Sequence, residues 1–502
     1  MSIATLVQDA GAKYADAEAV VDPGSDGTAR RVSFGELAQL VRRGAAFCLS
    51  RGIVPGDRVA VWAPNSLDWI VAALGAVSAG AALVPLNTRF KGDEASWILD
   101  KSRAALTFVA PPFLGNDYAA MLGGRDGVVT LDESLWDLEV PAQVDERIAS
   151  LGPDDVGDVI FTSGTTGRPK GVVTTHSQTL RVFETWSDVV GLAEGDRYLV
   201  VNPFFHTFGY KAGIIACLLR GATIVPQPVF DVPAVLDLIG RERISVLPGP
   251  PTLYQSILDA RDASHDLSTL RLAVTGAAVV PVALVERMFS DLGCETVLTA
   301  YGLTEATGTA TMCRRDDDAE TIATTSGRAI PDTEVRVVDV AGAAVPTGEP
   351  GEVVVRGYNV MQGYFEDPEA TAQTIDADGW LHTGDIGVLD ERGNLRITDR
   401  LKDMYVVGGF NAYPAEIEQV LARHPAIAEA AVVGVPDERL GEVGRAYVVA
   451  RPGQSVDPGE VVAFCREQMA NYKVPRSVEV VDVLPRNASG KVLKFELRGA
   501  AR

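Results

Sequence analysis

Short apolar segments alternate with helical segments through most of the first 300 residues, and this alternation constrains the fold more than any other feature of the chain. A strand followed by a helix and then by another strand predicts a mostly parallel sheet with helices on its faces. The alternation occurs twice, before and after a looser acidic stretch that ends at Asp155. We therefore expect an α/β protein whose large N-terminal domain contains two layered βα sheets.

The individual elements are assigned from hydrophobic periodicity and from the positions of glycine and proline. The expected strands are Arg58–Trp62, Ala82–Pro85, Val156–Phe161, Val172–Thr175, Tyr198–Asn202, Ile244–Leu247, Leu270–Thr275 and Thr296–Leu298. The expected helices are Ser33–Leu49, Leu67–Ala79, Asp93–Lys101, Ser177–Val189, Thr252–Ala260 and Pro281–Leu292.

The pattern changes from Glu334 onward to short alternating strands with glycine turns, which predicts a β-rich subdomain without helices. The expected strands there are Glu334–Val338, Gly351–Arg356, Gly387–Asp390 and Leu395–Thr398. After residue 403 helices and strands mix again, which predicts a small, mobile α+β domain. Its expected elements are Ala415–His424, Ile427–Val433, Gly444–Ala450, Pro458–Met469 and Val478–Val481. The predicted boundaries are therefore 1–399 for the large domain, 400–403 for a hinge and 404–502 for the small domain.

Composition narrows the class of protein. A chain of 502 residues should hold more than one domain, because single cores stop growing near ~250–300 residues. The net charge of −22 argues against nucleic-acid binding, which usually needs a basic face. The five cysteines are scattered without a Cys-x-x-Cys spacing, which is typical of buried thiols in a reducing cytoplasm.

No secretory signal and no membrane span are expected. Residues 1–19 carry several charges and lack an apolar core. The uncharged stretch from Trp69 to Leu86 is long enough for a membrane helix, but Gly75, Gly80 and Pro85 divide it into a helix and a buried strand. A cytoplasmic location follows as an expectation.

The segment Thr162–Lys170 reads Thr-Ser-Gly-Thr-Thr-Gly-Arg-Pro-Lys and follows an expected strand. Glycine allows close approach of the backbone, so N–H groups and hydroxyls can surround phosphate oxygens, and the lysine adds a positive charge. Only nine of the 45 lysine and arginine residues are lysines, which draws attention to Lys170. The spacing is not that of a Walker A loop. Taken alone, an ordinary surface loop is an equally good interpretation.

Three further motifs can each be interpreted in two ways. Thr299–Glu305, at a strand exit, offers a tyrosine for stacking and a carboxylate for Mg²⁺, whereas a helix cap would explain only Thr304. Leu381–Asp385 offers an aspartate for ribose hydroxyls, or a turn with a surface ion pair to Arg400. Pro485–Lys491 is a flexible loop that delivers a lysine, or a solvated tail.

Together these motifs identify a resemblance. Thr162–Lys170, Tyr301–Glu305, Thr383–Asp385, Asp399–Lys402 and Asn487–Lys491 occur in the order found in the adenylate-forming superfamily of acyl-CoA synthetases, peptide-synthetase adenylation domains and luciferases. The chain is similar to that superfamily over nearly its whole length. The resemblance implies an AMP-forming ligase with two steps. ATP and a carboxylic acid first give an acyl-adenylate and pyrophosphate, and the acyl group then passes to the thiol of CoA.

The resemblance also implies a role for each motif. The ATP-binding residues would be Thr162, Ser163, Gly164, Thr165, Thr166, Gly167 and Lys170 at the phosphates, Gly276, Ala277, Ala278, Thr299, Ala300 and Tyr301 at the adenine, Asp385 and Arg400 at the ribose, and Thr304. Glu305 would hold Mg²⁺, and Lys491 would bridge the carboxylate and the α-phosphate during adenylation only. Lys402 would be the hinge, and a thiol tunnel for CoA would form near Gly408, Gly409 and Phe410.

The acyl pocket is expected near His206, Tyr210, Lys211, Gly249 and Pro250. A histidine in an apolar segment is commonly a core residue, but the resemblance implies that His206 is a gate between pocket and thiol tunnel. The lysine is unusual, because a fatty-acid pocket needs no ammonium group. Two interpretations are equally good: Lys211 contacts a polar oxygen of the acid, or it faces solvent.

Within the superfamily, runs such as Asn202–Arg220 and Val246–Ile257 resemble actinobacterial FadD-type ligases of steroid catabolism. That resemblance implies a bicyclic methylhexahydroindanedione propionate as the acid. Medium-chain fatty or aryl acids, an acyl-AMP ligase that loads a carrier protein, and a non-catalytic nucleotide-binding module remain alternatives. A homodimer is compatible with the resemblance. Plant phenylpropanoid ligases and luciferases carry lysines after the hinge, where this chain reads Met404–Gly409, so no lysine role is transferred there.

Replacement of Lys491 by alanine should separate the two steps. We expect Lys491→Ala to abolish adenylation, measured by ATP–pyrophosphate exchange, and to spare thioester formation from supplied acyl-adenylate, because the ammonium group would neutralise charge only in the first step. Equal loss of both half-reactions would contradict this role.

Overall fold

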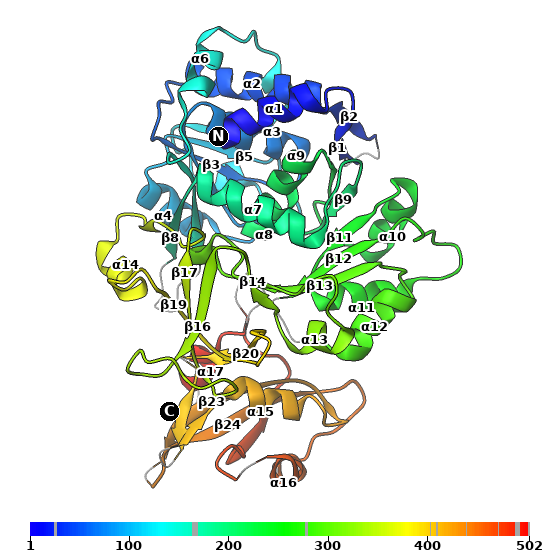
Figure 1. The fold of residues 1–502 in the computed structure, drawn as a ribbon, viewed down its shortest axis with the longest axis vertical. Helices are drawn as coiled ribbons and strands as arrows, with labels where there is room; N and C mark the ends of the chain where they lie inside the picture. The colour runs from blue at the N-terminus through cyan, green and yellow to red at the C-terminus, as the bar shows by residue number, and fades with distance from the viewer. Residues whose placement is uncertain are drawn as a thin grey trace. The chain divides into compact units, whose positions relative to one another are not determined.

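The computed structural model describes residues 1–24, 28–162, 169–276, 280–401, 403–407, 410–437, 439–469, 471–486 and 492–499, with the backbone alone for Arg400, Phe410 and Asn411. The chain divides into two compact units. The first contains residues 1–335 and 355–381, and the second contains residues 336–354 and 382–502. Each unit has a hydrophobic core of its own, and the elements of both are labelled in Figure 1.

The first unit contains a seven-stranded sheet in the order β18-β8-β7-β4-β3-β5-β6 (Figure 1). Its strands are β18 (Gly363–Tyr364), β8 (Lys170–Thr175), β7 (Val156–Thr162), β4 (Ala82–Pro85), β3 (Arg58–Trp62), β5 (Leu106–Val109) and β6 (Val128–Thr130). The inner strands are parallel, whereas β7 and β8 form an antiparallel pair in which Thr162 lies opposite Lys170. The segment predicted to bind phosphates therefore connects two adjacent, paired strands.

A nine-stranded sheet in the order β15-β14-β13-β12-β11-β9-β10-β1-β2 completes the first unit. Its strands are β15 (Arg328–Ala329), β14 (Thr311–Met312), β13 (Thr296–Tyr301), β12 (Leu272–Gly276), β11 (Val246–Pro248), β9 (Arg197–Val200), β10 (Thr223–Pro226), β1 (Glu18–Asp22) and β2 (Arg30–Ser33). The run from β13 to β1 is parallel, and antiparallel strands close both ends. Two layered βα sheets were predicted, and both are present.

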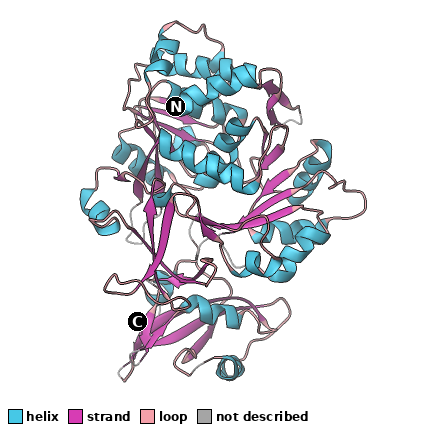
Figure 2. Cartoon of the chain, viewed as in Figure 1, coloured by secondary structure: helices cyan, strands magenta, loops and turns pink. Residues whose placement is uncertain are grey.

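Helices lie beside both sheets of the first unit (Figure 2). They are α1 (Ile3–Lys13), α2 (Phe34–Ser50), α3 (Leu67–Ser78), α4 (Gly92–Ser102), α5 (Tyr118–Met121), α6 (Gln143–Ser150), α7 (His176–Val190), α8 (Thr207–Gly209), α9 (Ala216–Arg220), α10 (Val232–Arg241), α11 (Pro251–Ala260), α12 (Val282–Ser290), α13 (Ala319–Thr324) and α14 (Pro368–Thr374), with the 3₁₀ turns η1 (Glu133–Trp136) and η3 (Thr304–Ala306) and the π-helix η2 (Tyr210–Ile215). Local chemistry sets some starts: Thr175 forms a capping box with Gln178, so α7 begins directly after β8.

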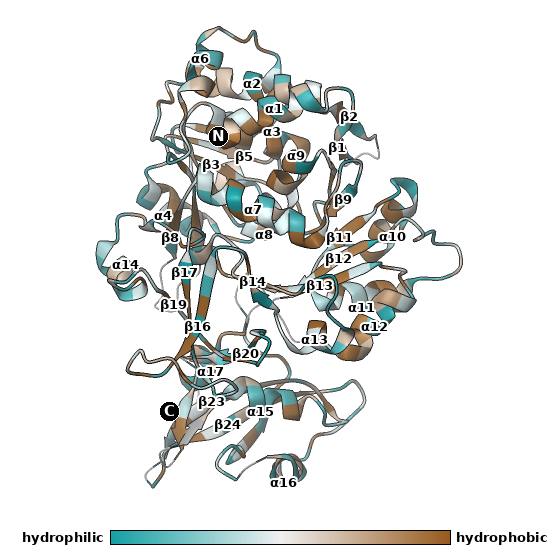
Figure 3. Cartoon of the chain, viewed as in Figure 1, coloured by the Kyte–Doolittle hydropathy of each residue, from teal (hydrophilic) through white to brown (hydrophobic). Residues whose placement is uncertain are grey.

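Helix α3 contacts β3 and β4 of one sheet and β1 of the other. Almost every residue of α3 is buried, and Figure 3 colours much of it as hydrophobic. A helix that is covered on all sides has no polar face, which explains the uncharged stretch that begins at Trp69. In the described part of the chain, no helix is both long and apolar enough to cross a membrane.

The second unit contains two further sheets. A four-stranded sheet in the order β16-β17-β19-β20 consists of β16 (Thr333–Val338), β17 (Gly351–Gly357), β19 (Leu381–Leu389) and β20 (Leu395–Arg400), and its first three strands begin or end in the first unit. A five-stranded sheet consists of β22 (Phe410–Ala412), β21 (Tyr405–Val407), β24 (Gly441–Ala450), β23 (Ile427–Asp437) and β25 (Ser477–Val480), and it packs with α15 (Pro414–Leu421), α16 (Pro458–Gln468) and α17 (Lys494–Gly499).

Most expected elements are present with ends shifted by one to three residues, but the β-rich region differs from its prediction. It contains a helix, α14, which begins after Asp367 caps it with Pro368 in the first turn, so the expectation of strands without helices was wrong. The strand expected at Gly387–Asp390 begins at Leu381 and includes the whole Leu381–Asp385 motif. The domain limits at 400–403 stay a prediction, because Lys402 lies outside the described residues.

Close packing of α2 and α3 generates a prediction for stability. A Cβ atom on Gly75 would lie 2.7 Å from the carbonyl carbon of Gly44, a backbone atom that cannot move by itself. We expect Gly75→Ala to reduce the free energy of unfolding by about 1–3 kcal/mol, because the helices must separate. Gly152→Ala is the control, since a Cβ there meets only Asp155 Oδ2, at 3.9 Å. Equal denaturation midpoints for the two variants would contradict the packing argument.

Candidate functional site

The carboxyl ends of four strands of the nine-stranded sheet carry most of the predicted ligand-binding segments. Strands β9, β11, β12 and β13 are parallel neighbours. They lead, respectively, into the segment that contains His206, into Gly249 and Pro250, to Gly276, and into the segment that contains Glu305. In open α/β sheets ligands bind outside the carboxyl ends of the strands. The sheet therefore places at one edge four segments that are far apart in the sequence.

Two asparagine side chains, buried Asn65 and half-buried Asn202, hold the His206 segment in place. Asn65 donates from Nδ2 to the carbonyl oxygens of Val200 and Asn202, at 3.1 and 2.9 Å, and accepts from the backbone N–H of Phe204 at 2.7 Å. Asn202 in turn donates to the carbonyl of Pro248 at 3.1 Å. These bonds connect the two segments that were predicted to form the acyl pocket, so the structure does bring them together.

The residues of that predicted pocket differ in exposure. His206 is exposed and caps α8, where its Nδ1 accepts a hydrogen bond from the N–H of Phe208 at 3.2 Å. Although part of the residue is exposed, the protein atoms packed around its imidazole lower the pKa of His206. An acceptor Nδ1 and a lowered pKa both favour the neutral imidazole with its proton on Nε2. Pro250 is exposed, whereas Tyr210 is fully buried and its ring lies 5.9 Å from that of Trp69.

Lys211 is buried rather than exposed, so the interpretation that it faces solvent was wrong. Its ammonium group lies 2.9 Å from Oδ2 of Asp158 and donates to Oγ1 of Thr174 at 2.8 Å. The lysine belongs to the π-helix η2, and both partners lie on the strands β7 and β8. Contact with a polar oxygen of an acid stays an untested alternative.

The segments predicted to line the adenine meet at the ends of β12 and β13. Gly276 lies opposite Ala300 in the parallel pair, and a Cβ on Gly276 would lie 2.8 Å from the carbonyl oxygen of Ala300. Only glycine permits this approach. The hydroxyl of Thr299 is buried and lies 2.8 and 2.9 Å from the carbonyls of Ile322 and Thr325, and its carbonyl accepts from the N–H of Cys313 at 2.9 Å, so neither group is available to a ligand. Tyr301, the last residue of β13, lies opposite Thr311.

Thr304 and Glu305 belong to the short 3₁₀ turn η3 directly after β13. Buried Asn359 holds the residues that follow them. Its side-chain Nδ2 donates to the carbonyl of Thr309 at 2.9 Å, and its backbone carbonyl accepts from the hydroxyl of Thr307 at 2.7 Å. The carbonyl of Glu305 accepts from the N–H of Met361 at 2.9 Å. The turn is thus fixed by a segment more than fifty residues later in the chain.

Tyr364 connects Glu305 to the predicted phosphate-binding segment. Its hydroxyl donates to Glu305 Oε1 at 3.0 Å, and Lys170 Nζ lies 4.8 Å from the centre of its ring. Strand β18 holds Tyr364 beside Val172 of β8, two residues after Lys170. Burial and the charge of Glu305 raise the pKa of Tyr364, so the phenol keeps its proton and remains a donor. Sequence reasoning missed Tyr364, because a Gly-Tyr pair after a glycine-rich turn carries no chemical signal of its own.

The residues predicted to bind the ribose lie on two paired strands of the second unit. Asp385 is buried on β19 and lies opposite Arg400 of β20, which excludes the alternative of an exposed turn. Thr383 accepts from the N–H of Asp385 at 3.1 Å and donates to the carbonyl of Val353 at 2.7 Å. Gly384 adopts a positive φ of 67°, a conformation that favours glycine. The aspartate is therefore held in a defined position beside the backbone of Arg400.

Several predicted site residues lie outside the described residues. They are Ser163, Gly164, Thr165, Thr166 and Gly167 of the phosphate segment, Ala277 and Ala278 of the adenine segment, the hinge residue Lys402, Gly408 and Gly409 of the CoA tunnel, and Lys491. For Arg400 and Phe410 the backbone alone is described. The roles of all these residues stay predictions.

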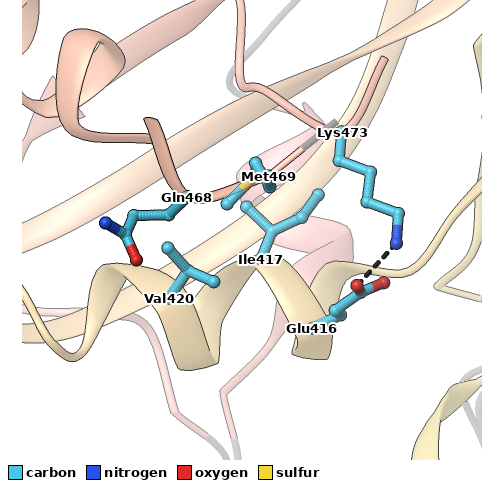
Figure 4. Close-up of a pocket in the computed structure, with 6 residues that line it drawn as sticks. All are labelled: Glu416, Ile417, Val420, Gln468, Met469 and Lys473. Atoms are coloured by element: carbon cyan, nitrogen blue, oxygen red, sulfur yellow. Dashed lines mark hydrogen bonds and ion pairs between the residues drawn. The ribbon is translucent and has the colours of Figure 1, made fainter. Parts of the chain in front are cut away.

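A pocket in the second unit is lined by residues outside the predicted site. Figure 4 shows this pocket, in which Lys473 and Glu416 form an ion pair at 2.5 Å. Its lining residues are Glu416, Ile417, Val420, Gln468, Met469 and Lys473, and none was predicted to act.

Among the described residues no three histidines, cysteines, aspartates or glutamates cluster as metal ligands would. A magnesium ion bound largely through nucleotide phosphates needs only one or two protein carboxylates, which Glu305 could supply.

Comparison with known proteins identifies the family of the chain. The AMP-binding enzyme family matches residues 7–365, and the AMP-binding enzyme C-terminal domain matches residues 416–491. The 3-[(3aS,4S,7aS)-7a-methyl-1,5-dioxo-octahydro-1H-inden-4-yl]propanoyl:CoA ligase of Rhodococcus jostii is 55% identical over 93% of both chains. A ligase of the same name from Mycobacterium tuberculosis is 56% identical over 93% of this chain and 94% of its own.

Similarity extends to solved structures. The ATP-bound structure of MatB from Rhodopseudomonas palustris superposes with a TM-score of 0.86 at 31% identity, and the match covers 100% of this chain and 99% of that one. The resemblance drawn from five ordered motifs is thereby confirmed. By its sequence, by its two matched segments and by its fold, the chain belongs to the AMP-binding enzyme family.

Proposed function

We propose that the protein is an AMP-forming acyl-CoA ligase whose acid is a propionate side chain on a fused, oxo-substituted ring system. The observation that carries the proposal is the 55–56% identity, over more than nine-tenths of each chain, to two ligases named for the indanedione propionate. Ligases of that name accept a bicyclic diketone, which no medium-chain fatty acid or simple aryl acid resembles. In the first step the carboxylate would attack the α-phosphorus of ATP to give an acyl-adenylate and pyrophosphate, and in the second the acyl group would pass to the thiol of CoA with release of AMP.

Adenylation brings two anions together, so the chemistry requires positive charge and oriented donors at the phosphates. The antiparallel pair β7–β8 places Lys170 opposite Thr162, at the two ends of the hydroxyl-rich segment. Lys170 lies over the ring of Tyr364, whose hydroxyl is bonded to Glu305. This arrangement supports a role for Lys170 beside the phosphates. The backbone of residues 163–167 would contribute to the same site, as the sequence leads us to expect.

Glu305 fits the part of a magnesium ligand. Tyr364 occupies Oε1, and within the described residues no group donates to Oε2. One free carboxylate oxygen on a fixed turn suits an ion that keeps most of its ligands as water and phosphate oxygens. When bound, Mg²⁺ would neutralise charge on the phosphates. The protein's own contribution would be to hold Glu305 in a single orientation.

The acid would enter beside the His206 segment. A neutral imidazole, which the hydrogen bond and the lowered pKa of His206 favour, would need no counter-charge beside an uncharged ring system, and the Asn65 and Asn202 bonds fix the backbone around it. Gating of the thiol by His206, delivery of Lys491 and swinging about Lys402 belong to the same proposal. They rest on the family resemblance, and domain closure is a recognised way to run two steps in one site.

A panel of acids tests the substrate class. We expect the purified protein to form AMP and an acyl-CoA from ATP, CoA and the indanedione propionate in the presence of Mg²⁺. The kcat/KM for that acid should be higher than for octanoate or ferulate, because a pocket shaped for fused rings leaves a chain or a single ring poorly packed. Release of AMP is followed by a coupled assay, and acyl-CoA by mass spectrometry. Preference for octanoate or ferulate would refute the substrate, accumulation of acyl-AMP without acyl-CoA would indicate a carrier-loading ligase, and ADP would refute adenylation.

Removal of one hydroxyl tests the orientation of Glu305. We expect Tyr364→Phe to raise the Mg²⁺ concentration needed for half-maximal adenylation about twofold to thirtyfold, because the carboxylate loses a donor that is worth about 0.5–2 kcal/mol. Binding of Mn²⁺ with a non-hydrolysable ATP analogue, followed by electron paramagnetic resonance, gives a readout without turnover. Tyr358→Phe is the control, since that phenol contacts Thr185 and not Glu305. Unchanged metal dependence in Tyr364→Phe would remove the assigned role.

A further inference from the structure

A closed network of buried charges joins three elements of the first unit. Asp158 on β7 and Thr174 on β8 lie opposite each other in the antiparallel pair, and the hydroxyl of Thr174 donates to Asp158 Oδ1 at 2.7 Å. Lys211 on η2 reaches both, at 2.9 Å to Asp158 Oδ2 and 2.8 Å to Thr174 Oγ1. The side chains of Lys211 and Asp158 are 1% and 0% exposed. Each of the three elements therefore holds the other two.

Stability alone does not explain this network. Moving two charges out of water is expensive, and well-packed apolar residues in place of a buried ion pair are often neutral or stabilising. Burial lowers the pKa of Lys211, and the nearby charge of Asp158 opposes that change. The pair is thus one that an apolar core could replace. What the ion pair adds is a defined position, because an ammonium group with two oxygen partners fixes where a helix lies on a sheet.

The residues of the network lie close in sequence to the segment predicted to bind the phosphates and to the segment predicted to bind the acid. Asp158 stands four residues before Thr162, and Thr174 stands four residues after Lys170, at the two ends of the predicted phosphate segment. Lys211 stands five residues after His206, in the predicted acyl pocket. Its helix η2 is a π-helix, a wide turn that is frequent at functional sites. One buried contact therefore connects the strands on either side of the phosphate segment to the acyl segment.

We propose that Lys211, with Asp158 and Thr174, is a positioning residue for adenylation: it fixes the acyl segment relative to the strands that hold the phosphate segment. The inference rests on the proposed function. Attack requires the carboxylate and the α-phosphorus in one geometry, and small misplacements cost large factors in rate. A supplied acyl-adenylate has its two halves already joined, so its use does not depend on this alignment. Lys211 acts through the backbone and does not select the acid by touching it.

The decisive comparison is between single and double variants. Lys211→Met and Asp158→Asn each leave a partner unsatisfied and should lower the melting temperature together with adenylation. The double variant Asp158→Leu/Lys211→Met removes both charges and should recover the melting temperature. We expect its adenylation, measured by ATP–pyrophosphate exchange, to remain at least about tenfold below wild type, with higher KM values for both ATP and acid. Its thioester formation from supplied acyl-adenylate should stay within about threefold of wild type, since the joined ligand needs no alignment.

Thr174 supplies a conservative test. Thr174→Val removes the hydroxyl that joins the two charges and should raise both KM values, whereas Thr174→Ser keeps the hydroxyl and should restore them. Arg271→Met is the matched control, because Arg271 pairs with Asp196 in the same unit at the amino ends of β12 and β9, away from the strand ends that carry the site. It should reduce stability and leave both KM values unchanged.

The outcomes separate this inference from the proposed function. An inactive wild type would refute the function itself. With an active wild type, full adenylation by the double variant would overturn the positioning role and leave the pair a purely structural one. Direct contact with the acid predicts a different result: Lys211→Met would change the ratio of kcat/KM between an indanedione propionate and the same acid without ring oxygens, with the KM for ATP unchanged. That result would also overturn the inference.

Discussion

Parallel pairing of β9, β11, β12 and β13 is the constraint on which the rest of the candidate site depends. Parallel strands run in one direction, so their carboxyl ends lie along one edge and everything that follows them begins there. The close contact between Gly276 and Ala300 shows how tightly this edge is packed. Segments that are tens of residues apart in the chain become neighbours through backbone hydrogen bonds alone, before any side chain acts.

Polar side chains then hold these segments in defined positions. Asn65 holds the acyl segment, Asn359 holds the turn after Glu305, and Lys211 connects η2 to β7 and β8. A buried amide or ammonium group that lacks its partners is costly, so each such residue favours one arrangement of backbone strongly over its alternatives. Tyr364 extends the same principle to a functional group, because it orients the carboxylate of Glu305, whose second oxygen accepts no hydrogen bond from the part of the chain that the structure describes. Buried polar groups thus define where the segments of the candidate site lie.

Local pattern predicted the elements well where one rule dominated. Strand Arg58–Trp62 is apolar after its first residue, contains the β-branched Val59 and Val61, and is followed closely by a proline, and its limits were correct. The prediction failed at α14, because a short helix of Pro368–Thr374 has too few turns to show a periodicity and depends on its aspartate cap. It failed for the exposure of Lys211, because a lysine in an apolar segment looks the same in sequence whether it reaches solvent or a buried aspartate fifty-three residues earlier.

The sequence by itself determined the family, the α/β class and the types of residue that could bind ATP, because ordered motifs and hydrophobic periodicity are local properties of a chain. Only the tertiary structure decided which of the residues predicted to bind ATP or the acid are available to a ligand. The hydroxyl of Thr299 is committed to the protein, the carboxylate of Glu305 is half engaged by Tyr364, and Lys211 is paired inside the core. These outcomes depend on partners that are distant in sequence, and such pairings are set by how sheets and helices pack.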